Sequence, residues 1–284
     1  MTFDEIERVA RLAQGLGVTN VRLTGGEPLL RPGLCDLVGR LASLGFAGLS
    51  LTTNGVALAD LARPLADAGL QRVNVGCDSL RPRRFADIRR GADLGQVLAA
   101  MDAAEAAGLV PLKVNVVLIA GWNDDEILEL ADFARVTGRV VRFIELLPLD
   151  AEGRWHRNLV VPGQRVIDEI SARWPLEPVP SDAGHGPSER FRFADGHGEI
   201  GVVRNVTAPF CGQCDRFRLT AEGNLRSCLF SDDEVPIRSL LRQGATDDDL
   251  RDVLRLAVMA KQAGHGMDDP GFVRPRRSIA AIGG

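Results

Sequence analysis

The chain has 284 residues, of which 45% are hydrophobic and 25% are charged, and these values are typical of a globular protein. Its formal net charge of −4 argues against general nucleic-acid binding, and no apolar run approaches the roughly 20 residues that span a bilayer. Residues 1–20 also lack the basic and apolar pattern of a signal peptide, so we expect a cytoplasmic protein.

Residues 1–150 repeat a unit of one helix and one strand. The first helix starts at a capping box of Thr2 and Glu5 and carries its apolar side chains on one face. Short apolar runs predict strands at Asn20–Leu23, Leu49–Thr52, Arg72–Cys77, Leu112–Ile119 and Val140–Leu146. Periodic segments between them predict helices at Leu34–Leu44, Leu58–Ala68, Leu94–Ala107 and Asp124–Val136. The alternation predicts an α/β fold, an incomplete parallel β/α barrel whose ligands bind at the carboxyl ends of the strands.

Residues 151–284 follow a different pattern, so we place a domain boundary at residue 150. A loop rich in proline and glycine leads to two predicted hairpins. The first pairs Arg190–Phe193 with Glu199–Val203, and the second pairs Phe217–Thr220 with Leu225–Leu229. A helix near Asp247–Gln262 is capped by Thr246. We expect this region to extend the barrel and to carry a cysteine cluster.

Three of the five cysteines are close in sequence: Cys211, Cys214 and Cys228. The second hairpin would return Cys228 towards the Cys211-x-x-Cys214 turn, so that three thiolates converge on a metal. Zinc would need a fourth ligand, for which the sequence offers His185, His197 and His265. A [4Fe–4S] cluster can instead leave one iron open, and the spacing alone leaves both alternatives open. Cys35 and Cys77 have no partners at metal-binding spacing and are expected to be core residues or incidental ones.

Basic residues interrupt strands that are otherwise apolar. Only Lys113 and Lys261 are lysines, and Lys113 lies within the fourth predicted strand, where an unpaired charge is costly. If the side chain of Lys113 points into the barrel, its ammonium would contact an anion such as a phosphate. If it points outward, its long aliphatic chain would carry the ammonium out of the sheet to solvent. Arg216 and Arg218 are two apart, so on a strand they would share one side. Together the basic residues would bind a polyphosphate, or each arginine would simply be solvated: Arg22, Arg142, Arg216 and Arg218.

A turn of two glycines follows the first predicted strand, in Thr24-Gly25-Gly26-Glu27-Pro28. Glycine lets the backbone approach a ligand closely, and the carboxylate of Glu27 would accept hydrogen bonds from an amino group. The same residues also fit an ordinary connection between a strand and a helix, and a Gly-Gly turn alone does not distinguish the two.

Five segments carry a resemblance to a known family. They are Val21–Arg31, Leu51–Gly55, Lys113–Val116, Arg142–Leu146 and Phe210–Thr220, and Ile282-Gly283-Gly284 agrees as well. In their order and spacing they resemble the molybdenum-cofactor biosynthesis protein A family, the radical-SAM GTP 3′,8-cyclases. The resemblance runs from Thr2 to Gly284 and implies a radical-SAM, TIM-like barrel.

The resemblance implies a role for each site residue. Contacts with GTP would come from Arg22, Thr52, Lys113, Arg142, Arg216 and Arg218. Contacts with S-adenosylmethionine (SAM) would come from Gly26, Gly76 and Leu147. Serine is more usual in the family at Gly76, and methionine is frequent at Leu147. A [4Fe–4S] cluster, with its open iron at the guanine ring, would be held by Cys211, Cys214 and Cys228.

The resemblance also implies a strand and a Cys-x-x-x-Cys-x-x-Cys loop before the first helix, holding the cluster that cleaves SAM. This sequence begins after that loop, so we expect a barrel without its first strand and without the ligands of that second [4Fe–4S] cluster. In a complete enzyme, a 5′-deoxyadenosyl radical would take a hydrogen from the GTP ribose, and the carbon radical would attack C8 of guanine.

Two other functions stay open on the sequence: a catalytically inactive protein that binds GTP and an iron–sulfur cluster, and a zinc-bearing structural or interaction module. The resemblance implies that an active enzyme hands its product to the cyclic pyranopterin monophosphate synthase. We further expect a homodimer, and neither nucleic acid nor a membrane as a partner.

Overall fold

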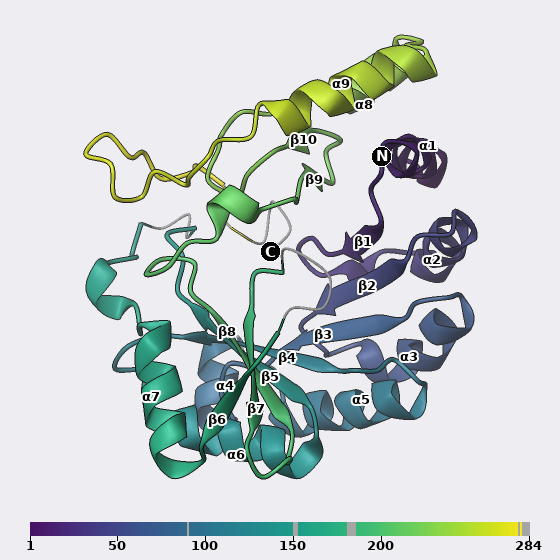
Figure 1. Cartoon of the computed structure of the whole chain (residues 1–284). Coiled ribbons are helices and arrows are strands. Elements are labelled where there is room, and N and C mark those ends of the chain that lie inside the picture. Colours follow the sequence, from purple (N-terminus) through teal and green to yellow (C-terminus); the bar gives the residue numbers. More distant parts are fainter. Residues whose placement is uncertain (90, 150–152, 181–185, 278, 280–284) are drawn as a thin grey trace.

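The computed structural model describes residues 1–89, 91–149, 153–180, 186–277 and 279 (Figure 1). Its first five strands are parallel neighbours in chain order: β1 (Asn20–Leu23), β2 (Gly48–Thr53), β3 (Arg72–Gly76), β4 (Lys113–Leu118) and β5 (Val140–Glu145). Each lies within about one residue of its predicted bounds. The prediction of a mostly parallel α/β sheet is therefore confirmed.

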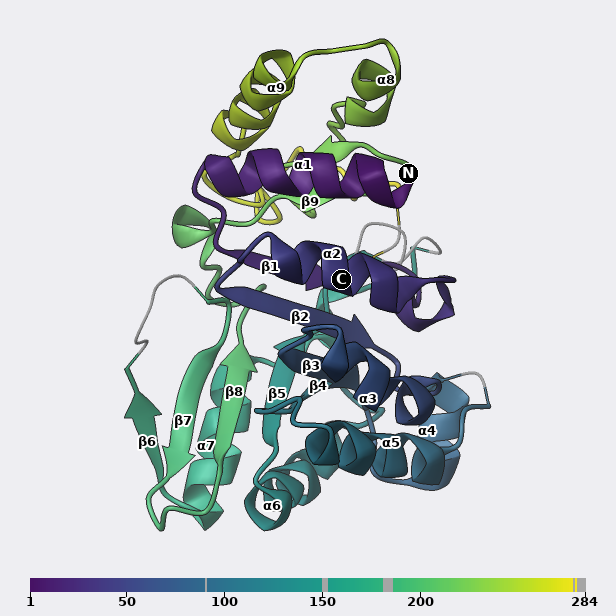
Figure 2. The same cartoon turned by 90° about the vertical axis from the view of Figure 1, so that its right-hand side faces the viewer.

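Helices cover the outer face of this sheet, as Figure 2 shows. They are α2 (Leu34–Ser43), α3 (Leu58–Asp67), α4 (Pro82–Ile88), α5 (Leu94–Ala106), α6 (Ile127–Thr137) and α7 (Gly163–Arg173). The strands meet them with alternate apolar side chains, which are buried in one core: Leu51, Val73, Val75, Val114, Val116 and Val141. Because side chains alternate along a strand, this packing turns every other strand residue towards the inner face.

The first predicted hairpin is present, and it joins the main sheet. Strands β7 (Glu189–Phe193) and β8 (Glu199–Val203) are antiparallel, and β8 lies parallel to β5. A further strand, β6 (Leu176–Val179), pairs with β7 at the edge. The sheet therefore continues past the boundary predicted at residue 150, and the part of the extension that carries the cysteines follows β8.

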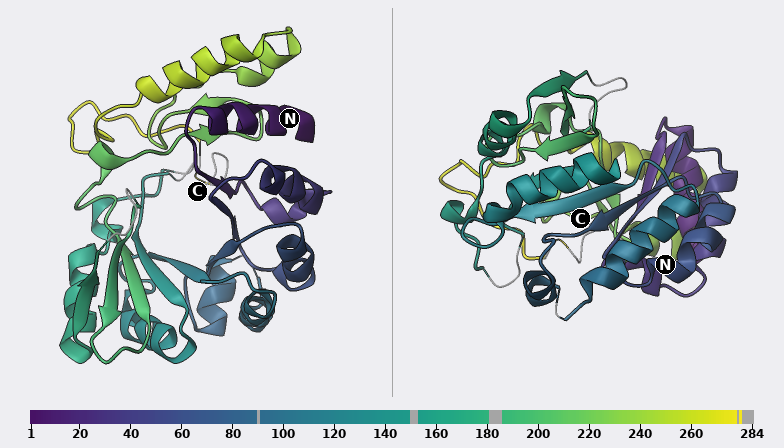
Figure 3. Two further views of the ribbon diagram at one scale, coloured as in Figure 1. Left: turned by 45° about the vertical axis from the view of Figure 1, so that its right-hand side comes forward. Right: turned by 90° about the horizontal axis from the view of Figure 1, so that it is seen from below.

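The part of the extension after β8 packs on the first helix rather than on the sheet. It contains β9 (Arg218–Leu219), β10 (Leu225–Arg226), α8 (Ile237–Arg242) and α9 (Asp247–Met259). Helix α1 (Phe3–Gly15) lies beside α9 (Figure 3), and Val9 and Leu12 of α1 share a second apolar core with Leu250 and Leu254 of α9. The capping boxes at Thr2 and Thr246 start these two helices as predicted.

A buried carboxylate joins the sheet to the extension. Glu145, at the end of β5, accepts hydrogen bonds from the backbone amides of Gly163, Val206 and Thr207 at 2.8, 2.7 and 2.9 Å. This contact fixes residues 206–207 shortly before the first cysteine of the extension. Among the described residues, every helix is too short or too polar to cross a membrane.

Candidate functional site

Strand register places a row of polar side chains on the inner face of the sheet. Residues paired between parallel strands point to the same side. Ser50 pairs with Arg22, and Thr52 pairs with Asn74. Asn74 in turn pairs with Lys113, and Asn115 pairs with Arg142. Since the alternate residues fill the outer core, four of the six predicted GTP contacts lie on one inner face: Arg22, Thr52, Lys113 and Arg142.

Lys113 and Arg142 have no acidic partners within the described ranges of the chain. Arg142 donates to Asn115 Oδ1 at 2.9 Å and to Asn74 Oδ1 at 3.0 Å, which are neutral acceptors. Among the described residues, no carboxylate forms an ion pair with Arg142 or Lys113. Burial, together with the charge of Arg142, lowers the pKa of Lys113 from its ordinary value near 10.5 to about 8. Burial also lowers the pKa of Arg142, to about 9. Lys113 thus points inward, and the outward alternative is wrong.

The extension adds two more arginines to this cationic face. Burial, and then the charge of Arg216, lowers the pKa of Arg218 to about 10. Partial desolvation and the same neighbour also lower the pKa of Arg22, although its side chain is exposed on β1. Arg216 precedes strand β9, so the prediction that Arg216 and Arg218 share one strand face is wrong. Instead, the guanidinium of Arg216 lies 4.9 Å from the ring centre of Phe210, and its Nε is buried without a partner among the described residues.

The three predicted SAM contacts lie at the carboxyl ends of parallel strands. Gly26 follows β1, Gly76 ends β3 and the half-buried Leu147 follows β5. Gly25 has a φ of +141°, a conformation that favours glycine, and the space where a side chain of Gly26 would lie is open. The backbone of this turn is therefore accessible to a ligand.

Glu27 accepts hydrogen bonds from two segments of the fold. Its carboxylate accepts from Thr53 Oγ1 at 2.7 Å and from the backbone amides of Asn54 and Leu29 at 2.7 and 3.1 Å. These contacts tie the turn after β1 to the end of β2. The interpretation of Glu27 as an acceptor for a ligand amino group stays a prediction, since Oε2 accepts only one of these hydrogen bonds.

The three clustered cysteines line a single cavity. Cys211 begins a short 3-10 turn, Cys214 ends it, and Cys228 follows β10. The cavity is also lined by Arg218, Phe230 and His265. Burial opposes ionisation of Cys214, but hydrogen bonds from Arg216 outweigh it and lower the pKa of this thiol. Burial and the neighbouring Cys228 raise the pKa of Cys211.

A zinc ion at the three cysteines would need a fourth ligand, for which the sequence offers histidines. His265 is the one histidine that lines this cavity among the described residues. Its ring is occupied: Nδ1 accepts from the amide of Met267 and Nε2 lies 3.1 Å from the carbonyl of Asn205. His197 lies in the exposed turn between β7 and β8, and His185 lies outside the described residues. Among the described residues, no three His, Cys, Asp or Glu side chains are grouped as ligands of one metal ion.

The other two cysteines are remote from this cavity. Cys77 is fully buried in the main core, and burial raises the pKa of its thiol to about 12. Cys35 lies half-buried on α2. Their expected placement away from the cluster is confirmed.

Lys261 is a site residue that the sequence reasoning missed. Its ammonium donates to the carbonyl oxygens of Arg216 and Ser227, the second at 2.9 Å. These carbonyls lie two residues after Cys214 and one residue before Cys228. Lys261 therefore fixes the two cysteine-bearing segments relative to each other. The sequence feature that could have pointed to Lys261 is its rarity, since it is one of only two lysines.

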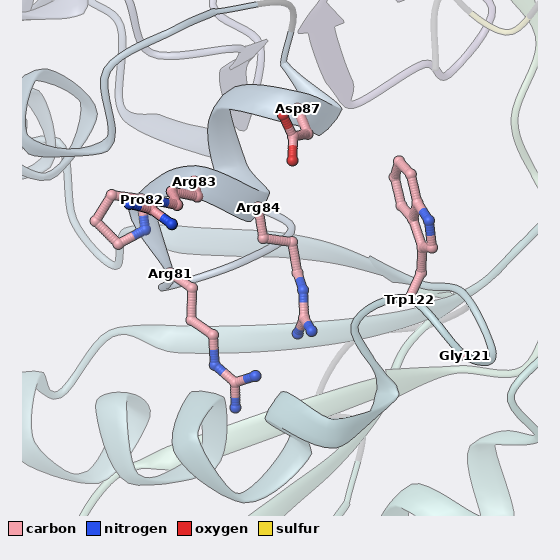
Figure 4. A pocket seen from close by; sticks show the side chains of 7 residues that line it. All are labelled: Arg81, Pro82, Arg83, Arg84, Asp87, Gly121 and Trp122. Atoms are coloured by element: carbon pink, nitrogen blue, oxygen red, sulfur yellow. The ribbon is translucent and has the colours of Figure 1, made fainter.

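A larger cavity, of about 620 Å³, lies away from these residues (Figure 4). It lies between the start of α4 and the loop after β4, with Arg81, Arg84 and Trp122 in its wall. Arg81 and Arg84 each contact Asp125 at 2.6 Å, and Arg84 also contacts the buried Glu126 at 2.5 Å. Because these arginines are already paired, the inner face is the better anion site.

The sequence matches two families, one in each part of the chain. Residues 1–134 match the Radical SAM superfamily, and residues 139–267 match Molybdenum Cofactor Synthesis C. The chain is 45% identical to a GTP 3′,8-cyclase of Streptomyces coelicolor, over 100% of this chain and 84% of that protein. It is 40% identical to a GTP 3′,8-cyclase of Corynebacterium glutamicum, over 99% of this chain and 77% of that protein.

Solved structures share the fold of the sheet. Streptococcus suis SuiB bound to its precursor peptide SuiA is similar with a TM-score of 0.52 and 16% identity, over 61% of this chain and 39% of that chain. SuiB bound to S-adenosylmethionine gives the same TM-score of 0.52 over 40% of its chain. The structural likeness shows a radical-SAM fold, and the sequence matches are more specific. The chain belongs to the GTP 3′,8-cyclase family of radical-SAM proteins.

Proposed function

We propose that the chain acts as a GTP 3′,8-cyclase of molybdenum cofactor biosynthesis, with GTP bound between the inner face of the sheet and the cysteine cavity. The observation that carries the proposal is the pair of the half-buried Lys113 and the buried Arg142, two inward-facing cations that form no ion pair with a carboxylate among the described residues. A buried cation is costly unless an anion compensates it, and a triphosphate supplies several negative charges at once. The product would pass to the cyclic pyranopterin monophosphate synthase.

The phosphates and the base of GTP would be bound by different groups of residues. Lys113, Arg142 and Arg22 would hold phosphate oxygens from the sheet, while Arg216 and Arg218 would close over them from the extension. Arg218 also lines the cysteine cavity, so the phosphates and a base lying at that cavity fit one continuous site. Cys211, Cys214 and Cys228 would hold the [4Fe–4S] cluster there, with one iron open to the base.

The carboxyl ends of β1, β3 and β5 would hold SAM through Gly26, Gly76 and Leu147. When bound, SAM with a second iron–sulfur cluster supplies the radical that starts the rearrangement. The protein's share is to place the GTP ribose beside that radical source and to exclude water. We further propose that the outer edge of β1, which pairs with no described residue, accepts another strand of the barrel.

A second candidate function is binding of GTP and a cluster without radical formation. Residues 1–284 contain only Cys35 and Cys77 besides the three clustered cysteines, so they supply no second group of three thiolates. Reductive cleavage of SAM separates the two functions. A polypeptide limited to these residues that yields 5′-deoxyadenosine with dithionite would contradict the second candidate.

GTP binding is expected to take up a proton at pH 8. The pKa of Lys113 is about 8 in the free protein, so its amine is partly neutral at this pH, and a bound triphosphate favours the charged form. Arg142, whose pKa is about 9, is mostly charged at pH 8. The affinity should therefore fall as pH rises above about 8, by up to about tenfold per pH unit for one coupled proton. Calorimetric titration of GTP in buffers of different ionisation enthalpy measures the uptake. Lys113→Gln should lose most of it, and equal uptake by both proteins would contradict the GTP site.

Lys261 is expected to be a positioning residue for the cluster. Lys261→Met removes both hydrogen bonds between the cysteine-bearing segments. Residues that orient metal ligands typically contribute about 10- to 100-fold in metal affinity, and we expect a loss of that size. Iron retained against a chelator measures it, with Arg255→Met on the exposed side of α9 as the control. A folded Lys261→Met protein with undiminished iron retention, or a loss that Lys261→Arg does not partly restore, would contradict this role.

A further inference from the structure

The guanidinium of Arg89 occupies the space above Gly76. A side chain beginning at Gly76 would place its Cβ 2.5 Å from Arg89 Nη2 and 3.3 Å from Arg89 Cζ. Such contacts are far closer than packed atoms allow, so a residue larger than glycine at 76 and the present position of Arg89 exclude each other. Serine is more usual in the family at position 76. In this chain, the space that a serine side chain would take is occupied by the guanidinium of Arg89.

Arg89 is held in this position from both ends. Its backbone caps α4, and its Nη2 lies 2.6 Å from Asp78 Oδ2. The other carboxylate oxygen of Asp78 accepts from the amide of Val117 on β4 at 2.9 Å, so the acid is itself fixed. Arg89 Nε is buried and has no hydrogen-bond partner among the described residues. An unsatisfied buried donor is costly, which is consistent with a ligand that completes the site.

Gly76 shares the inner face with Asn74 and pairs with Asn115, so the guanidinium lies at the inner, carboxyl end of β3. This is one of the three positions proposed to contact SAM. SAM carries an ammonium and a sulfonium, which a guanidinium repels, and a single anionic group, its carboxylate. Guanidinium and carboxylate form charge-assisted hydrogen bonds of matched geometry.

We propose that Arg89 binds the carboxylate of SAM and so replaces the contact that a serine at position 76 would make. The inference rests on the proposed function, because it takes the SAM site at Gly26 and Gly76 as given. It adds to that function a specific recognition residue, supplied by helix α4 rather than by the strand.

Equilibrium dialysis with radiolabelled SAM and with decarboxylated SAM tests the proposal on the reconstituted 284-residue chain. The second ligand lacks only the carboxylate. Arg89→Ala should bind SAM about tenfold more weakly and decarboxylated SAM as the wild type does, because one charge-assisted contact is lost. Arg83→Ala, an exposed arginine on the same helix, is the matched control and should bind both ligands normally. Equal losses for both ligands in Arg89→Ala, or no loss, would overturn the proposal.

A reciprocal variant tests the exchange of side chains. Gly76→Ser combined with Arg89→Ala restores the serine and removes the obstruction, so SAM should bind more tightly than to Arg89→Ala alone. No gain in the double variant would contradict the exchange. Failure of the wild type to bind either ligand would count against the proposed SAM site itself, whereas equal affinity of the wild type for both ligands would count against Arg89 alone.

Discussion

Replacing Cys211, Cys214 and Cys228 together by alanine is expected to abolish a cluster of about four irons per chain. The three thiols line one cavity, and hydrogen bonds from Arg216 favour the thiolate of Cys214. The thiolate is the form that binds a metal. Iron and acid-labile sulfide, measured after anaerobic reconstitution, should both fall to background in the triple variant.

Cys35→Ala is the matched control, because Cys35 is also half-buried but lies on α2, away from the cavity. It should retain the full iron content. An iron content in the triple variant equal to that of the wild type would contradict the assignment of these cysteines as cluster ligands. About one zinc per chain in the anaerobically purified wild type, without iron or sulfide, would replace the cluster with the zinc-bearing structural alternative.

Lys113→Ala is expected to weaken GTP binding by at least about tenfold. A charge-assisted contact contributes roughly 1.5–3 kcal/mol, and about 1.4 kcal/mol corresponds to a factor of ten. The loss should be much smaller for guanosine, which has no phosphates for Lys113 to contact. Calorimetric titration of both proteins with both ligands, at pH 7 where Lys113 is charged, measures the difference.

Arg63→Ala provides the control for this change, since Arg63 is an exposed cation on α3, behind the sheet. Its GTP affinity should equal that of the wild type. Circular dichroism confirms that each variant is folded. A Lys113→Ala protein that is folded and binds GTP as tightly as the wild type would remove Lys113 from the site, and equal losses for GTP and guanosine would mean that it does not contact phosphate.

The sequence predicted the parallel part of the sheet because local signals decide it there. Up to β5, apolar strands alternate with helices whose apolar residues recur at helical spacing. The glycine-rich or polar residues at the carboxyl ends of these strands were therefore predicted to lie at one edge of the sheet. The sequence did not show that α1 packs on α9 or that β8 lies beside β5. Both are contacts between segments far apart in the chain, which depend on the packing of the whole molecule rather than on any local pattern.

The sequence predicted which residues belong to the candidate site, but not the contacts that these residues make. Lys113 stood out because a charge within an apolar strand is costly, and strand register then shows its direction. The partners of Glu27 were not predicted, because two of the three lie on another segment, at the end of β2. Arg89 gave no signal at all, since its place above Gly76 depends on how α4 folds back over the end of β3.

One continuous site is expected to bind the phosphates of GTP on the inner face of the sheet and its base at the cysteine cavity. A crystal structure of the anaerobically reconstituted chain with GTP would show this arrangement. We expect phosphate oxygens in hydrogen-bond contact with Lys113 and Arg218, and the guanine beside Cys211, Cys214 and Cys228. Phosphates bound instead at Arg81 and Arg84 in the 620 Å³ cavity, with the inner face empty, would contradict it.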